Sequence, residues 1–564
     1  MSDWPTDDNE EDWLAPLSAM LADLGTADPP RRRELLAAIL DLSWKVGPNA
    51  SAAIPALIDW PLSDDNETED SVCYALSNCW PASFAPLLER LNHPSELARK
   101  RACHALRLVG QGVGDRLIPT ADALLARLQD TSDAVRGEAA FALGLVGDQR
   151  GATVDRLIEV TGTGSTSTRA SALHAIGNIC SKRAEEGSHG EAAPFAGAAN
   201  VILAALDDAD ADVRKSACYA LGHLGLPASQ HLERILLILE ADPSGVVRDW
   251  AASQLPVLAE RTDISSATAT LARLLRNAPV LPSPSSSQRS IAWSICSALG
   301  KIGPGARAAV PALLKALNDD WIALAAAEAL WRIERRAELV LPALDRQFDG
   351  NGENVCDIVC LMGPEARPLL PKLLDALTRD DYWDLQWAAA DAIGHVAAAD
   401  PETLQALRAA VLHESGIVRS AAARAFARIG APAVPLLLDM LAPETDEKTQ
   451  ECVAMALSQI GSPAVAAVPS LRARLDSESR GLRIWAAFAL AKIASDAEAM
   501  PTLMKVLDDE DLADMWQQTC DALGAIGTSA GAARDRLATL ATCPVDEIRR
   551  AAELALAAID RPPN

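Results

Sequence analysis

The stretch Asp212–Gly225, DVRKSACYALGHLG, recurs along the chain with the same order of polar, small and apolar residues. We use Leu221 as the anchor that aligns the copies, because an equivalent apolar residue returns in each of them, and the last four anchors are 33 residues apart. The anchors are Leu40, Leu76, Leu106, Leu143, Ile176, Leu221, Leu255, Leu299, Leu330, Val359, Ile393, Phe426, Leu457, Leu490, Leu523 and Leu556. The chain of 564 residues therefore consists of about sixteen copies of one unit.

Each copy has the sequence features of two consecutive helices. The first helix often begins with a proline and has a leucine two residues later, as in VPALLKAL at Pro311 and VPLLLDML at Pro435. A short turn rich in Asp or Asn follows, and these residues are good N-caps for a second helix. A glycine after the second helix suits a left-handed C-terminal turn, as in SALGKIG up to Gly303. The pattern predicts a helix pair for every copy.

The shared pattern D-x-x-V-R-x-x-A-x-x-A-L-G-x-I-G resembles the HEAT repeat, in the short form found in phycobilin-lyase-type proteins. The resemblance covers roughly residues 30–560. It implies an all-α fold, an α-α superhelix of about sixteen helix pairs. We expect one solenoid over residues 11–561, a disordered acidic tail at 1–10, and insertions at 181–198 and 277–289, the latter a Pro/Ser-rich candidate bend.

An arginine stands seven residues before the anchor in nine copies: Arg33, Arg99, Arg136, Arg169, Arg214, Arg248, Arg419, Arg483 and Arg549. The HEAT resemblance implies a ladder in which these arginines bond Asp side chains or carbonyls in the inter-helix turns, with Asp130, Asp207 and Asp476 available. The alternative is a basic rail for phosphates. The net charge of −26 disfavours that alternative and predicts no nucleic-acid binding. It favours protein partners with a basic face.

Six cysteines share the position three residues before the anchor: Cys73, Cys103, Cys218, Cys296, Cys356 and Cys520. Equivalent positions on stacked helices lie too far apart for a shared metal, so we expect small buried residues there, and no metal or cofactor. The start of the chain lacks the features of a secretory signal, and no apolar run is long enough to span a membrane. These features predict a cytoplasmic protein without membrane association, and the Ala/Arg/Asp-rich composition favours a bacterial source.

The sequence predicts no enzyme activity and no catalytic residues. Deoxyhypusine hydroxylases, which are HEAT-like, hold iron with several His–Glu pairs six and five residues before the anchor, whereas this chain has one such pair, His413–Glu414, at another position. Phosphate-binding and hydrolase motifs are also absent from the sequence. Two alternatives to a scaffold stay open: a bilin-lyase-like protein that handles a tetrapyrrole chromophore, and a structural subunit of a larger assembly.

Aromatic side chains recur two residues before the anchor, on the side of the second helix opposite its buried stripe. We call the series the aromatic column: Tyr74, His104, Phe141, His174 and Tyr219. It is extended by His223, Trp250 and Trp293, and later copies form an acidic patch with Glu328, Asp357, Trp387 and Asp391. We expect these residues to bind a partner segment along the concave face of a protein-interaction scaffold. The alternative is that the aromatic column packs between neighbouring repeats.

Overall fold

The computed structural model describes residues 11–24, 26–46, 54–58, 66–185, 196–225, 231–277, 286–379, 383–543 and 545–561. Every regular element in these ranges is a helix, which confirms the predicted all-α fold. The chain forms two compact units, residues 1–313 and 314–564. This boundary comes later in the sequence than the predicted bend at 277–289. Residues 278–285 of that bend lie outside the described residues, as do the predicted tail 1–10 and residues 186–195 of the first insertion.

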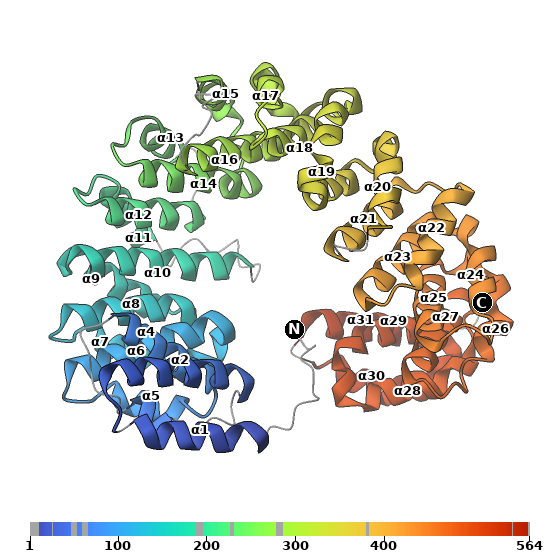
Figure 1. The fold of residues 1–564 in the computed structure, drawn as a ribbon, viewed down its shortest axis with the longest axis horizontal. Coiled ribbons are helices and arrows are strands. Elements are labelled where there is room, and N and C mark those ends of the chain that lie inside the picture. The colour runs from blue at the N-terminus through green and yellow to red at the C-terminus, as the bar shows by residue number, and fades with distance from the viewer. Residues whose placement is uncertain are drawn as a thin grey trace. The chain divides into compact units, whose positions relative to one another are not determined.

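The first unit consists of stacked helix pairs (Figure 1). The second helices of the pairs are α2 (Pro29–Val46), α4 (Asn66–Asn78), α6 (Glu96–Val113), α8 (Asp133–Val146), α10 (Thr166–Glu185), α12 (Ala211–His223), α14 (Gly245–Arg261) and α16 (Ser286–Ile302). The first helices are α1 (Glu11–Leu24), α3 (Ile54–Ile58), α5 (Phe84–Arg90), α7 (Ala121–Arg127), α9 (Gly151–Thr163), α11 (Ala196–Ala205), α13 (Leu232–Ala241) and α15 (Thr268–Asn277). Each second helix packs against the second helix of the next pair, and α13 and α15 lie on the outer side of α14 and α16 (Figure 1).

The second unit repeats this arrangement, and α17 (Val310–Ala316) spans the boundary between the units. Its second helices are α18 (Ala323–Glu334), the C-terminal half of α19 (Ala337–Met362), α21 (Trp383–Val396), α23 (Gly416–Ile429), α25 (Glu447–Ile460), α27 (Arg480–Ala494), α29 (Trp516–Ile526) and α31 (Asp546–Ile559). Its first helices are the N-terminal half of α19, α20 (Leu370–Ala376), α22 (Pro401–Val411), α24 (Val434–Met440), α26 (Val468–Arg472), α28 (Met500–Asp508) and α30 (Arg534–Leu540). Helix α19 joins both helices of one pair across a kink at Asn351, so Pro342 lies inside it rather than at a helix start.

Local sequence explains where the helices begin and end. Asp210 accepts hydrogen bonds from the backbone N–H groups of Asp212 and Val213 at the start of α12, and Ser132 accepts one from Val135 at the start of α8. Gly147 ends α8 with a φ of 72°, a conformation that favours glycine. The anchors from Leu76 to Leu523 are buried, as are the alanines that precede them, whereas the last anchor, Leu556, is partly exposed. Caps and core therefore follow the repeat pattern.

The arginine ladder implied by the HEAT resemblance is present. Arg99, Arg169 and Arg214 pair with Asp130, Asp208 and Asp242 of the following turns, at 2.7, 2.8 and 2.8 Å. Each aspartate also accepts a backbone N–H within its own turn, and the pKa of each carboxyl is lowered by these hydrogen bonds despite burial. In the second unit the ladder arginines bond turn carbonyls, as Arg419 does with the His413 oxygen at 2.7 Å.

Two ladder partners differ from the expectation. Arg483 bonds the carbonyl oxygens of Ser477 and Glu478 rather than the predicted Asp476. Asp208 receives Arg169, whereas the predicted Asp207 pairs with Arg234 of α13 at 2.5 Å. The two carboxylates are adjacent in the turn, and Asp208 also accepts the Asp210 N–H within that turn. The ladder thus pairs these arginines with carboxylates or carbonyl oxygens inside the fold.

The six cysteines before the anchors are all buried and carry free thiols, as predicted. Burial raises the pKa of Cys218 and Cys520 to about 12. No single helix in the described ranges is long and apolar enough to cross a membrane, although Gly416–Ile429 and Ala431–Met440 together reach the threshold across a bend of 118°. The apolar side chains of that pair, such as Phe426 and Leu437, are buried within the second unit.

Candidate partner-binding surface

The aromatic column runs across the second helices of the first unit, from α4 to α12, and Trp250 of α14 and Trp293 of α16 follow it. Its members differ in exposure although they share one position in the repeat. Tyr74 and Trp293, at the two ends, are 48% and 53% exposed, whereas His104 is only 8% exposed. Between these ends the rings of Phe141, His174, Tyr219 and Trp250 are partly exposed.

Four rings of the column form one continuous cluster. The rings of Phe141 and His174 stack with centroids 5.0 Å apart, and those of His174 and Tyr219 stack at 4.5 Å. Trp250 meets Tyr219 edge-to-face at 5.8 Å. Stacked and edge-to-face rings at these distances attract each other. The cluster therefore packs between neighbouring repeats, as one of the two alternatives drawn from the sequence has it, and also keeps part of each ring at the surface.

Polar and cationic groups fix the rings of the cluster. The Tyr219 hydroxyl donates a hydrogen bond to Oδ1 of Asn178 on α10, at 2.8 Å. The Arg107 guanidinium lies 5.2 Å from the centroid of Phe141, and the Lys215 ammonium lies 6.0 Å from that of Trp250. Cations over aromatic faces at such distances are stabilising. The cluster is thus a supported surface rather than a set of loose side chains.

The histidines of this surface are neutral at pH 7. Burial lowers the pKa of His174 to about 4, with a smaller contribution from Lys215. Burial also lowers the pKa of His223 to about 4, helped by Arg261 and His174. An uncharged imidazole suits the faces of neighbouring aromatic rings, so the surface is mainly apolar.

His104 is oriented inward by a hydrogen bond. Its Nε2 lies 2.6 Å from Nη2 of Arg107. A guanidinium can only donate, so Nε2 accepts and the ring proton is on Nδ1. Burial lowers the pKa of this imidazole too. His104 was predicted as part of the partner-binding surface, but in the structure it supports Arg107 and offers little ring area to a partner.

A hollow of about 360 Å³ opens beside the ring cluster. Its lining includes Phe141, His174 and Trp250 and, from the N-terminal ends of α10 and α12, mainly hydroxyl-bearing and charged residues. We call this second group the rim: Thr166, Ser167, Ala170, Ser171, Asp210, Asp212, Lys215 and Ser216. Sequence reasoning missed this rim, although its residues lie at the N-terminal ends of the helices that carry His174 and Tyr219. The hollow combines aromatic faces with two carboxylates.

The predicted acidic patch lies in the second unit and is partly neutralised there. Glu328 pairs with Arg332 at 2.8 Å, and Asp391 pairs with Arg428 at 2.7 Å. Arg424 lies 3.6 Å from the same Asp391 carboxylate. The sequence analysis missed these arginines, of which Arg424 and Arg428 stand two residues before and after their own anchor. The patch is therefore less negative than its predicted members suggest.

Two other members of the acidic patch, Asp357 and Trp387, are exposed. Partial burial of its carboxyl group still raises the pKa of Asp357, and the carboxylates of Glu328 and Asp391 add to the effect. Trp387 is 39% exposed and lies one turn before Asp391 on α21. The acidic patch and the aromatic column belong to different units, so each is a candidate surface of its own unit.

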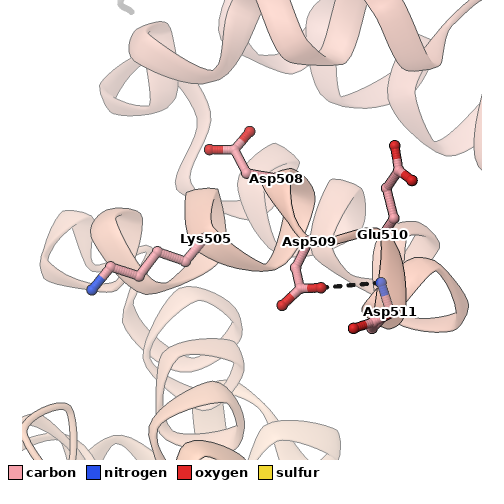
Figure 2. Close-up of a pocket in the computed structure, with 5 residues that line it drawn as sticks. All are labelled: Lys505, Asp508, Asp509, Glu510 and Asp511. Atoms are coloured by element: carbon pink, nitrogen blue, oxygen red, sulfur yellow. Dashed lines mark hydrogen bonds between the residues drawn. The ribbon is translucent and has the colours of Figure 1, made fainter.

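A second hollow, of about 430 Å³, lies at the turn after α28 and is lined by Lys505 and four consecutive acidic residues, Asp508 to Asp511 (Figure 2). Asp509 accepts the backbone N–H of Asp511 at 3.0 Å and pairs with Arg480. Figure 2 shows the Asp508 and Glu510 side chains extending away from that hydrogen bond. The Trp516 indole N–H also donates to the carbonyl oxygens of Val506 and Asp509, at 3.1 and 3.2 Å, so this turn is a capped connection between helices.

Comparison with known proteins agrees with the repeat pattern. Sequence profiles of HEAT repeats match residues 121–186, 199–226, 370–457 and 468–557. No curated protein sequence shows significant similarity to the chain. Among solved structures, Kap121p is 14% identical over 98% of this chain and 67% of its own, with a TM-score of 0.63. Yeast importin-beta, Kap95p, is 12% identical over 97% of this chain and 84% of its own, with a TM-score of 0.60.

A further similar structure contains a bound protein segment. It is the karyopherin Kap121p bound to the extreme C-terminus of the protein phosphatase Cdc14p, 13% identical over 99% of this chain and 79% of that one, with a TM-score of 0.50. At identities this low, the structural similarity establishes a shared α-solenoid fold alone.

Proposed function

Because the chain is a HEAT-repeat protein, we propose that it is a non-enzymatic scaffold that binds a segment of a partner protein along the second-helix face of its first unit. The observation that carries this proposal is the continuous ring cluster of Phe141, His174, Tyr219 and Trp250, part of which stays at the surface. A solenoid buries its apolar residues between helix layers, so a row of partly exposed rings on one face needs a reason.

The ring cluster has the properties of an interface centre. Aromatic side chains are large, lose little conformational entropy on binding, and commonly dominate binding free energy. Stacking and the Tyr219–Asn178 hydrogen bond hold the rings in place before a partner arrives, which lowers the entropic cost of association. The exposed rings of Tyr74 and Trp293 lengthen the apolar track beyond the cluster. A track spread over seven successive second helices suits an extended or helical segment better than a small molecule.

Charge favours a partner segment that carries basic residues. Asp210 and Asp212 stand on the rim of the hollow beside the ring cluster, and one ammonium, that of Lys215, stands with them. Asp212 pairs with Lys215 at 2.8 Å, while the Asp210 carboxylate accepts the backbone N–H groups of Asp212 and Val213. The chain as a whole has a net charge of −26. A Lys or Arg of the partner would therefore be attracted to this rim while apolar neighbours cover the rings.

The similar solved structures support the general form of this proposal. Kap121p, a solenoid of the same fold, is seen bound to the C-terminal segment of a phosphatase. That observation concerns Kap121p; for the present chain it supports segment binding as a use of the fold, with the partner left to experiment.

The proposal is tested by partner capture followed by a binding measurement. The tagged chain would be used to capture proteins from a lysate of its source organism, in parallel with the variant Trp250→Ser/Trp293→Ser. A matched control is Trp321→Ser, which removes a 64% exposed tryptophan from a turn of the second unit. Binding of a dye-labelled synthetic segment of the captured protein would then be followed by the fluorescence anisotropy of the label. We expect the double variant to weaken binding at least about tenfold and the control to bind as wild type does.

Equal binding by the double variant and wild type would contradict the proposed surface. An absorbance change with added bilin that is lost in the double variant would instead favour the tetrapyrrole alternative. A mass in light scattering well above the 59.6 kDa of one chain would favour the structural-subunit alternative.

A further inference from the structure

Three side chains with metal-binding atoms converge in the second unit, away from the aromatic column. Asp391 and His395 lie one turn apart on α21, and Cys360 faces them from α19. Their sulfur, carboxylate oxygen and imidazole nitrogen all lie within 4.8 Å of one another. The Asp391 Oδ2 is 3.8 Å from the Cys360 sulfur and 3.7 Å from the His395 Nε2. Side chains from two repeats thus point at one small volume.

We propose that Cys360, Asp391 and His395 bind a divalent transition-metal ion of the zinc class. Zinc bonds of about 2.3 Å to sulfur and about 2.0 Å to nitrogen or oxygen, at tetrahedral angles, place sulfur and oxygen about 3.5 Å apart and nitrogen and oxygen about 3.3 Å apart. The two separations from Oδ2 exceed these values by only a few tenths of an ångström, and the Cys360 sulfur lies within 4.8 Å of the imidazole nitrogen, so side-chain rotations that draw these two atoms together would complete the site. Three protein ligands leave a fourth position for water or for a partner's side chain.

The arginines that contact Asp391 support this assignment. Arg428 donates to Oδ1 of Asp391 at 2.7 Å, and Arg424 lies 3.6 Å from the same oxygen. The other oxygen, Oδ2, is the one that faces Cys360 and His395. Hydrogen bonds to the non-ligating oxygen are the usual way in which a protein orients a ligating carboxylate.

The charge around the site can accommodate a dication. The positive charges of Arg424 and Arg428 oppose cation binding. They are offset by Asp391 itself and by the carboxylate of Asp357, which is near enough to interact with that of Asp391. A thiolate from Cys360 on metal binding adds one more negative charge.

The ligand set also selects the class of metal. A thiolate and an imidazole are ligands for zinc, cobalt, nickel or copper, whereas magnesium and calcium require oxygen ligands. Cys360, Asp391 and His395 are all partly exposed, so an ion can enter from solvent. The neighbouring Cys356, in contrast, is fully buried with the other cysteines that precede the anchors. Only Cys360 has this combination of access and partners among the cysteines the structure describes.

The test is a cobalt titration of the full chain, stripped of metal by a chelator and kept reduced. Cobalt(II) bound to a thiolate gives a sulfur-to-metal charge-transfer band in the near ultraviolet, which reports on ligation directly. We expect the wild-type band to saturate at one equivalent and to disappear on addition of zinc. Cys360→Ser should abolish the band, and His395→Ala should weaken cobalt binding at least about tenfold.

Two further variants make the titration specific. Cys452→Ser removes another partly exposed thiol of the second unit and should leave the band unchanged. Arg428→Met removes the hydrogen bond that orients Asp391. Although it also removes a positive charge that opposes the cation, it should weaken binding about tenfold or more, because the carboxylate is no longer held in place, while the band keeps its shape. Circular dichroism melting checks that each variant is folded, and Cys360→Ala replaces Cys360→Ser if the latter is not. The proposal is overturned if wild type shows no band at one equivalent, or if folded Cys360 variants keep it.

Discussion

The imidazole of His174 lies parallel to the phenol ring of Tyr219, with centroids 4.5 Å and planes 16° apart, although the rings come from successive repeats. The Tyr219 hydroxyl reaches back to Asn178 on the helix of His174, so two contacts join α12 to α10 on this face. The same side chains thus connect neighbouring repeats and form a partly exposed surface. Their substitution is expected to affect stability as well as binding.

Members of the aromatic column should differ in their contribution to stability. Phe141→Ser and Tyr219→Ser each remove a partly buried ring with stacked neighbours, and we expect a loss of about 1–3 kcal/mol in the free energy of unfolding. Tyr74→Ser removes a ring that is 48% exposed and should change it by less than about 0.5 kcal/mol. Urea denaturation followed by circular dichroism measures the difference. A Tyr74 variant as unstable as the Tyr219 variant would show that exposure is not the deciding quantity.

Stability should decline between pH 6.5 and pH 4 because of His174 and His223. Each has a pKa of about 4 in the folded chain against an ordinary value of 6.5. In this interval the unfolded state binds protons that the folded state does not, so the contribution of these two histidines to the free energy of unfolding falls as the pH falls and is constant above about pH 7. Across this interval the melting temperature of wild type should fall more steeply than that of His174→Phe/His223→Phe. Parallel curves would assign the decline to other groups.

The repeat pattern predicted the fold because its determinants are local. Helix caps, the anchors and the buried cysteines all depend on positions within one copy, and the structure places them as expected. The position of the ladder partners Asp130 and Asp242 can also be read from the repeat, since each lies in the turn that follows its arginine's repeat.

The candidate sites could not be predicted fully because they depend on contacts between copies. Tyr74 and His104 hold the same position in their repeats, yet only His104 is turned inward, by its bond to Arg107. Asp391 was predicted without a charged partner, whereas Arg428 of the next repeat forms an ion pair with it. The convergence of Cys360 with Asp391 likewise involves two helices, and a single repeat contains no sign of it.

The buried rungs of the arginine ladder should contribute strongly to stability. The side chains of Arg214 and Asp242 are only 11% and 5% exposed, so Arg214→Met leaves a carboxylate buried without its cation. We expect a loss of about 3 kcal/mol in the free energy of unfolding, measured by urea denaturation. Arg534→Met is the matched control, because Arg534 and Asp560 form a pair in which both side chains are more than half exposed. This variant should lose less than about 1 kcal/mol. Similar losses in the two variants would contradict a special role for the ladder.

Glycines that follow the anchors set the distance between successive second helices, and Gly144→Ala should therefore be destabilising. A Cβ on Gly144 would lie 2.5 Å from the Ala175 Cα of the next second helix, and backbone cannot yield as a flexible side chain can. We expect a loss of about 1–3 kcal/mol from the displacement of α10 relative to α8. Gly162→Ala, in helix α9, is the matched control, since its Cβ would have no neighbour within 4 Å. That change should stabilise the chain by up to about 1 kcal/mol, because alanine favours a helix over glycine. Opposite shifts in melting temperature for the two variants would support close packing of α8 on α10, and equal shifts would rule it out as the reason for glycine at this position.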